Sequence, residues 1–129
     1  MDSGTNYRLY LGRKGEELAC AMLESDGHRI LERNWRSSHL EIDIISLNAD
    51  GIHFVEVKTR RKSIQAPPQD NVGTAKQRRT AKAAQAFLRS EKGRRFRNLE
   101  CFFDVAAITF AGEEAVAELI ANAYIPIFL

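Results

Sequence analysis

The sequence predicts an α/β fold, a single mixed β-sheet flanked by helices with its elements in the order αβββαββ. Two segments carry apolar residues at helical spacing, and five shorter segments are rich in β-branched and aromatic residues. The 129 residues, 44% of them hydrophobic and 28% charged, suffice for one domain with a buried core. Because no repeat, low-complexity tract or linker divides the chain, we expect one domain over residues 1–129.

The first helix is expected over Tyr10–Asp26. Five apolar residues there share one helical face: Leu11, Leu18, Ala19, Met22 and Leu23. Gly27 follows and suits the left-handed conformation that often ends a helix. Residues 1–8 show no such pattern, so we expect them to form a flexible N-terminus.

Two adjacent acids in this helix differ in their predicted orientation. At roughly 100° per residue, Glu16 lies at the border of the apolar face and Glu17 lies on the opposite side. Glu16 is therefore the acid that could face the rest of the fold. The alternative is that both acids are solvent-exposed and stabilise the first turns of the helix through its dipole.

Three strands are expected next, over His28–Arg36, Leu40–Leu47 and Ile52–Thr59. Asp50-Gly51 is a strong hairpin signal between the last two strands. Strict alternation then separates the side chains of the hairpin onto two faces. One face would carry the charged residues Glu41, Asp43, Glu56 and Lys58, and the other would pack Ile42, Ile44, Val55 and Val57 against a helix.

The second half of the chain continues the α/β pattern. Residues 60–73 are expected to form a polar, mobile loop that contains Pro67-Pro68. A second helix is predicted over Thr74–Arg89 because its apolar residues fall on one face and its basic residues on the other. The remaining expectations are a basic turn over Glu91–Asn98, strands over Phe102–Phe110 and Ala115–Ala121, and a tail over Ile125–Leu129 that packs or extends from a sheet edge.

The net charge of +2 conceals a strong asymmetry along the chain. Residues 58–97 hold 13 of the 19 basic residues and two of the 17 acids, a net charge of +11, which leaves −9 for the remainder. Clustered positive charge favours a polyanionic partner, of which nucleic acid is the commonest. The alternative is a solvated surface that keeps the protein soluble.

The sequence also indicates a cytoplasmic protein that is not bound to a membrane. No apolar run is long enough for a membrane-spanning helix, and no secretory signal begins the chain. Cys20 and Cys101 are far apart in the sequence and lack further cysteine partners, so we expect two reduced, buried thiols.

The hairpin acids predict a metal site. Charge inside apolar strands is costly to bury unless a partner or a metal compensates. The carboxylates of Asp43 and Glu56 and the backbone carbonyl of Val57 could hold Mg²⁺ or Mn²⁺, while Lys58 could orient the attacking water or stabilise phosphate charge. Glu16 could join through a water. The same spacing also fits a ladder of surface salt bridges, and the residues alone leave both interpretations open.

Other polar residues are assigned around this site. Six basic residues are expected to contact phosphates, namely Arg60, Arg61, Lys76, Arg78, Arg79 and Lys82. Glu41 and His39 share strand parity with Asp43 and are placed at the edge of the site. His28 and His53 are expected to be structural or surface residues, and Trp35 to pack in the core or on the sheet instead of stacking on bases.

Six blocks in this chain resemble the motifs of the YraN family of small bacterial proteins. They are Gly12-Arg13-Lys14-Gly15-Glu16-Glu17-Leu18-Ala19, Arg33-Asn34-Trp35-Arg36, Glu41-Ile42-Asp43-Ile44-Ile45, Phe54-Val55-Glu56-Val57-Lys58-Thr59-Arg60, Phe103-Asp104-Val105 and Asn122-Ala123-Tyr124. The blocks occur in order from about residue 10 to 124, and that family is similar to the archaeal Holliday-junction resolvases and other restriction-endonuclease-like nucleases.

The resemblance implies a restriction-endonuclease-like fold with a nuclease set of Glu16, Asp43, Glu56 and Lys58. It further implies Mg²⁺-dependent cleavage of DNA, in particular branched DNA, and a homodimer. Leu40 departs from the family pattern, which usually has glycine there, and this raises the question of how closely a phosphate approaches. Asp104 matches a family block and is expected to be a structural or supporting acid.

Two other functions fit the same sequence. The first is a nucleic-acid-binding module that keeps the fold without catalysis, and it predicts salt-sensitive binding without cleavage. The second is an interaction protein whose sheet face is simply charged, and it predicts neither DNA binding nor metal binding.

Overall fold

The computed structural model describes residues 3–62 and 72–125. Its elements are α1 (Ser3–Ser25), β1 (Arg29–Ser37), β2 (Leu40–Asn48), β3 (Gly51–Arg61), α2 (Thr74–Arg89), the 3₁₀ helix η1 (Arg94–Phe96), β4 (Cys101–Ala111) and β5 (Glu114–Tyr124). This order confirms the predicted αβββαββ arrangement. The loop expected around Pro67-Pro68 and the end of the tail, residues 126–129, lie outside the described residues.

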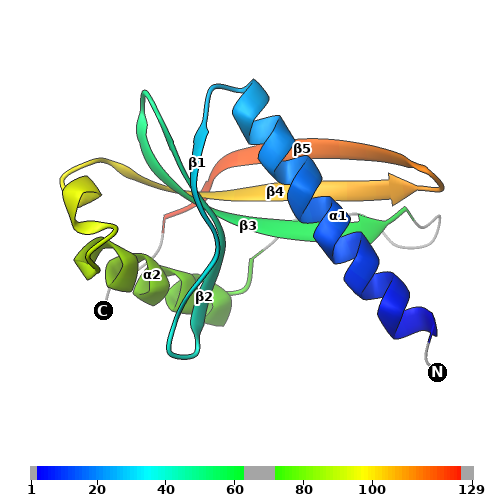
Figure 1. Ribbon diagram of the computed structural model, residues 1–129, viewed down its shortest axis with the longest axis horizontal. Coiled ribbons are helices and arrows are strands. Elements are labelled where there is room, and N and C mark those ends of the chain that lie inside the picture. Colours follow the sequence, from blue (N-terminus) through cyan, green and yellow to red (C-terminus); the bar gives the residue numbers. More distant parts are fainter. Residues whose placement is uncertain (1–2, 63–71, 126–129) are drawn as a thin grey trace.

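The five strands form one mixed sheet in the order β1-β2-β3-β4-β5 (Figure 1). β3 and β4 are parallel, and the other neighbouring pairs are antiparallel. Parallel pairing requires a long crossover connection, which α2 provides between β3 and β4. The predicted α/β fold with a single mixed sheet is therefore confirmed, and the arrangement is that of a nuclease-like α/β fold.

A helix covers each face of the sheet. Apolar residues of α1, including Leu23, pack in one core cluster with Ile44 and Val55. Apolar residues of α2, including Phe87, pack in a second cluster with Ile45 and Phe54. Since successive residues of a strand point to opposite faces, the two helices must lie on opposite sides, as Figure 1 shows.

The hairpin predicted from Asp50-Gly51 joins β2 and β3. The register pairs Asn48 with Gly51 and continues to Ile44 opposite Val55. The Oδ1 atom of Asn48 accepts hydrogen bonds from the backbone N–H groups of Asp50 (2.9 Å) and Gly51 (3.3 Å) and closes the turn. Gly51 has a φ of 153°, and a Cβ there would meet the carbonyl of Glu100, so the position requires glycine.

Two local predictions were wrong. The first helix begins at Ser3, so residues 3–8 are helical instead of forming a flexible terminus. Ile42 packs in the α2-side cluster, whereas Ile44 packs in the α1-side cluster, although strict alternation had placed both on one face. The alternation fails because the pairing of β2 with β3 starts at Ile44, so the preceding part of β2 diverges from β3.

Candidate active site

Asp43 lies where β2 separates from β3. Its Oδ2 atom accepts a hydrogen bond from the backbone N–H of Val57 at 2.8 Å, so a side chain takes the place that a strand carbonyl would otherwise occupy. Burial raises the pKa of Asp43, the hydrogen bond from Val57 lowers it, Glu16 and Glu56 raise it further, and Lys76 lowers it, with a net upward shift. The site therefore gathers negative charge that the protein only partly compensates.

Glu56, the second carboxylate predicted for the site, is buried in β3 and is not among the residues that line the cleft beside Asp43. Its Oε1 atom lies 2.7 Å from the Nζ atom of Lys76, in the first turn of α2. Its Oε2 atom is buried and has no hydrogen-bond partner among the residues that the structure describes. A buried polar atom without a partner costs about 1–3 kcal/mol, and more if it is charged, so this oxygen requires an explanation.

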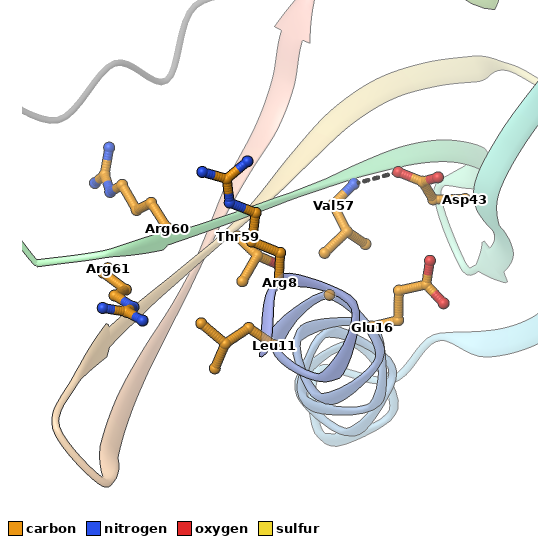
Figure 2. Close-up of a pocket in the computed structure, with 9 residues that line it drawn as sticks. Arg8, Leu11, Glu16, Asp43, Val57, Thr59, Arg60 and Arg61 are labelled. Carbon is orange, nitrogen blue, oxygen red and sulfur yellow. Dashed lines mark hydrogen bonds between the residues drawn. The ribbon is translucent and has the colours of Figure 1, made fainter. Parts of the chain in front are cut away.

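A cleft of about 750 Å³ opens between α1 and β3 beside Asp43. Figure 2 shows its two chemically different ends. Asp43 and Glu16 lie at the acidic end, while Arg8, Arg60 and Arg61 lie at the basic end. The remaining lining residues between them are Leu11, Gly12, Val57 and Thr59.

Two contacts position Glu16 against the sheet. Asn34, which has a positive φ of 51° in β1, donates a hydrogen bond from Nδ2 to Oε2 of Glu16 at 3.2 Å. Gly15 packs so closely on Thr59 that a Cβ on Gly15 would overlap the threonine hydroxyl. Glu16 is half-buried and lines the cleft, whereas Glu17 is exposed, as the helical pattern predicted.

The donor set for a metal is small. Within the described ranges, 3–62 and 72–125, no three His, Cys, Asp or Glu side chains gather closely enough to hold an ion by themselves. Mg²⁺ commonly binds through one or two carboxylates and takes its other ligands from water and substrate phosphates. Asp43 and the unpaired oxygen of Glu56 fit that pattern, and the carbonyl of Val57 is the backbone donor predicted for it.

The other predicted site residues are distributed unevenly. Lys58 is half-buried on β3, and strand alternation places it on the same face as Glu56. The structure does not bring Glu41 and His39 to the acids. Glu41 pairs with Arg36 in an exposed ion pair at 3.3 Å, and His39 lies exposed in the turn before β2.

The six basic residues predicted to contact phosphates separate into three groups. Arg60 and Arg61 line the cleft. Lys76 is paired with Glu56 and therefore belongs to the carboxylate cluster. The other three, Arg78, Arg79 and Lys82, are exposed on α2, on the other side of the sheet from the cleft.

Leu40, Asp104 and Trp35 have structural surroundings. Leu40 packs against the α2-side core and does not line the cleft. Asp104 is buried among hydrogen-bond donors. Trp35 packs edge-on against Phe87 with ring centroids 5.3 Å apart, which confirms its predicted core role.

Two further predictions concerned the state of the cysteines and the lack of a membrane-spanning helix. Cys20 is buried, Cys101 is half-buried, and both are free thiols. In the part of the chain that the structure describes, no helix combines the length and apolarity needed to cross a membrane.

A five-stranded mixed sheet with one helix on each face is consistent with a nuclease-like α/β fold. The family described as "Uncharacterised protein family UPF0102" matches residues 15–108, and the chain belongs to this family. The resemblance to YraN proteins that the motifs indicated is thereby confirmed.

Relatives of this family cover nearly the whole chain. A UPF0102 protein of Syntrophotalea carbinolica is 42% identical over 120 residues, 93% of this chain and 95% of the relative. A UPF0102 protein of Geobacter metallireducens is 44% identical over 88% of this chain and 91% of its own length. One of Chlorobium chlorochromatii is 44% identical over 80% and 77%, respectively.

Sequence reasoning missed two residues of the site. Arg8 lies in the stretch that was expected to be flexible, so no periodic pattern indicated it. Asn34 falls within the Arg33-Asn34-Trp35-Arg36 block, and that motif was the available signal for its role beside Glu16.

Proposed function

We propose that this protein is a Mg²⁺- or Mn²⁺-dependent endonuclease that binds DNA, including branched DNA of the Holliday-junction type, and hydrolyses phosphodiester bonds. The observation that carries the proposal is the buried Oε2 atom of Glu56, which has no partner among the described residues and belongs to a carboxylate that helps to raise the pKa of Asp43. A divalent cation would satisfy this oxygen and relieve the repulsion between the two carboxylates.

Each residue of the site has a role in this proposal. Asp43 and Glu56 would hold the ion together with the carbonyl of Val57. When bound, the ion would lower the pKa of a coordinated water and neutralise charge on the phosphate. Lys58 would orient the attacking water or stabilise charge on the phosphate, and Glu16, held by Asn34, would accept a hydrogen bond from water.

The basic end of the cleft supports a polyanionic substrate. Arg8, Arg60 and Arg61 line the same cleft as the acids, at its opposite end, so a phosphate backbone bound to them would extend toward Asp43. Arg78, Arg79 and Lys82 would contribute electrostatic attraction from α2 without approaching the scissile bond. The proposal also includes DNA as the substrate in preference to RNA, and a homodimer. It places the protein in the cytoplasm, and the two free thiols agree with that location.

The proposal is tested with supercoiled, single-stranded and four-way DNA in the presence of Mn²⁺. Wild type is expected to cleave at least one of these substrates. Asp43→Asn keeps the shape of the side chain and an oxygen that can accept the Val57 N–H, but it removes the charge, so cleavage should be lost. Glu17→Gln, on the exposed side of α1, is the control and should cleave like wild type. Equal behaviour of wild type and Asp43→Asn would refute a catalytic role for Asp43.

One observation favours a second candidate, a nucleic-acid-binding module without catalysis. The ion pair between Lys76 and Glu56 already compensates one oxygen of the carboxylate that a cation would need. This candidate predicts DNA affinity that falls steeply with salt and no cleavage with any divalent ion. The same substrate panel distinguishes the two functions.

A further inference from the structure

The N-terminal turns of α1 expose two aromatic rings. Tyr7 is 40% exposed and Tyr10 is 56% exposed, and their rings stack with centroids 6.4 Å apart and an interplanar angle of 23°. Neither tyrosine belongs to either core cluster of the described residues. Packing within the described part of the fold therefore does not account for them.

Cations flank both rings. The guanidinium carbon of Arg61 lies 4.3 Å from the ring centroid of Tyr7, and the Nζ atom of Lys14 lies 5.9 Å from that of Tyr10. Arg61 also lines the cleft that leads to Asp43. Exposed aromatic rings interleaved with cations are typical of surfaces on which the bases of single-stranded nucleic acid stack.

The tyrosine pair lies next to the cleft. A depression of about 360 Å³ is lined by Tyr7, Tyr10 and Lys14, among other residues, and it shares Leu11 with the cleft. From Tyr10 to Glu16 the helix advances six residues, or about 9 Å along its axis. Figure 2 shows Arg8, Arg60 and Arg61 at the end of the cleft away from Glu16 and Asp43, so a strand whose bases stack on the tyrosines would have these arginines available to its phosphates.

We infer that Tyr7 and Tyr10 form a stacking platform for unpaired bases, so that the preferred substrate is nucleic acid with a single-stranded segment next to the scissile phosphate. This inference rests on the proposed function and specifies its substrate. In paired DNA the base faces are already stacked, so the platform would act only where bases are unpaired, as at an end, a gap or an opened branch point.

Charge argues against the other occupant of this surface, a second copy of the chain. Arg8, Arg13, Lys14 and Arg61 are exposed on or beside the platform, and Glu113 is the acid that lines the depression. An interface related by two-fold symmetry would bring two such basic groups together, which is unfavourable. A polyanion compensates the same charge.

The test is equilibrium binding of labelled oligonucleotides without divalent metal, measured by fluorescence anisotropy. The probes are a single strand, a blunt duplex, and the same duplex with a single-stranded overhang. Tyr7→Ala and Tyr10→Ala should each weaken binding of the single strand and the overhang by about fivefold or more, since one stacked base contributes at least about that factor. Affinity for the blunt duplex should change by less than about twofold.

Matched variants separate the ring from other effects. Tyr7→Phe and Tyr10→Phe keep the rings and should bind single strands like wild type. Leu9→Ala removes a neighbouring apolar side chain that is 57% exposed, and it should also bind like wild type. Thermal unfolding of each variant confirms that the protein remains folded.

Three results would overturn the inference. They are unchanged single-strand affinity in both alanine variants, an equal loss for the single strand and the duplex, and an alanine variant that turns a wild-type dimer into a monomer in sedimentation. The inference and the proposed function fail separately. Ring-dependent binding without Mn²⁺-dependent cleavage would refute catalysis alone, and cleavage unaffected by the tyrosine changes would refute the platform alone.

Discussion

Two buried carboxylates on neighbouring strands of the sheet have opposite surroundings. Asp104 on β4 has both oxygens paired, because Oδ2 lies 2.6 Å from Nδ1 of His53 and Oδ1 accepts the backbone N–H of Asn122 at 2.7 Å. Glu56 on β3 has one oxygen paired with Lys76 and one without a partner in the described part of the chain. The difference separates a structural acid from one that is available to a ligand.

The network around Asp104 extends to the β2–β3 turn. Nε2 of His53 lies 2.8 Å from Oδ1 of Asn48, the oxygen that also accepts the turn N–H groups, so Nε2 must donate. Nδ2 of Asn48 lies 3.5 Å from Nε2 of His28, and Nδ1 of His28 lies 2.9 Å from Oγ of Ser46. A neutral His28 that donates from Nδ1 and accepts at Nε2 satisfies these contacts. Of the structural or surface roles predicted for His28 and His53, this buried network supports the structural one.

The largest difference between Glu56 and Asp104 is expected in DNA cleavage after each acid is neutralised. Glu56→Gln should lower Mn²⁺-dependent DNA cleavage by about 100-fold or more, because it removes a ligand charge at the reacting centre. Asp104→Asn should leave the rate of the folded protein within a few fold of wild type. Single-turnover rates of the two variants, with the folded fraction determined by circular dichroism, provide the measurement. A similar loss of rate in both variants would remove the functional distinction.

Stability should show the reverse order. Asp104→Asn should lower the free energy of unfolding by about 2–3 kcal/mol, because a buried charged hydrogen-bond partner is lost. Glu56→Gln should change it by less than about 1 kcal/mol, because the ion pair that it breaks involves a half-exposed lysine and the charge that it removes is poorly compensated. Urea denaturation measures both. If Glu56→Gln proved the more destabilising change, Glu56 would be a structural acid.

A smaller effect is expected from moving α1 against the acids. Gly15→Ala places a methyl group where the Thr59 hydroxyl lies, so the helix or the threonine must shift and Glu16 with it. We expect cleavage to fall by roughly tenfold, since small displacements of positioned groups are costly. Gly73→Ala, outside the cleft, is the control, because a Cβ there meets no atom within 4 Å and its φ of −63° suits alanine. Equal rates for the two variants would argue against a role for the position of Glu16.

The smallest effects are expected in the pH dependence of stability, and they have opposite signs for His28 and for Asp43. Burial lowers the pKa of His28, and the neighbouring His53 contributes to the shift. A basic group whose pKa is lowered in the folded state contributes its full stability at pH values above its ordinary pKa, which is about 6.5 for histidine. This contribution is lost as the pH falls from that value through the folded-state pKa. The pKa of Asp43 is instead raised in the folded state. Its contribution to stability is therefore largest at pH values below the ordinary aspartate pKa of about 3.9, and it is lost as the pH rises through the folded-state pKa.

Denaturation at a series of pH values tests these signs. His28→Asn should reduce the loss of stability on acidification below about pH 6.5. Asp43→Asn should be more stable than wild type at neutral pH, and the difference should vanish in acid. A wild type that loses stability on acidification no faster than His28→Asn, or an Asp43→Asn variant destabilised at pH 7, would contradict the assigned environments.

The sequence allowed regular elements to be predicted where one local pattern dominates. The bounds of α2, Thr74–Arg89, and the β2–β3 turn were correct because the apolar face of the helix and Asp50-Gly51 are strong local signals. The choice of Glu16 over Glu17 was correct for the same reason. The start of α1 was missed because Tyr7, Arg8 and Leu9 are exposed, so no buried stripe identifies them as helical.

The features of the site that were not predicted depend on distant parts of the chain. The reversal between Ile42 and Ile44 arises where β2 leaves β3, and strand parity assumes that pairing continues. The contact between Lys76 and Glu56 joins α2 to β3 across a long connection. Since these contacts depend on tertiary packing, residue spacing alone could not place them.

The most direct test of the central claim is the binding of Mn²⁺ to the protein without DNA, measured by isothermal titration calorimetry. Wild type should show a site that is lost in Glu56→Gln and retained in Asp104→Asn. Identical Mn²⁺ binding by wild type and Glu56→Gln, or no binding by either, would contradict the claim that the unpaired oxygen of Glu56 serves a divalent cation.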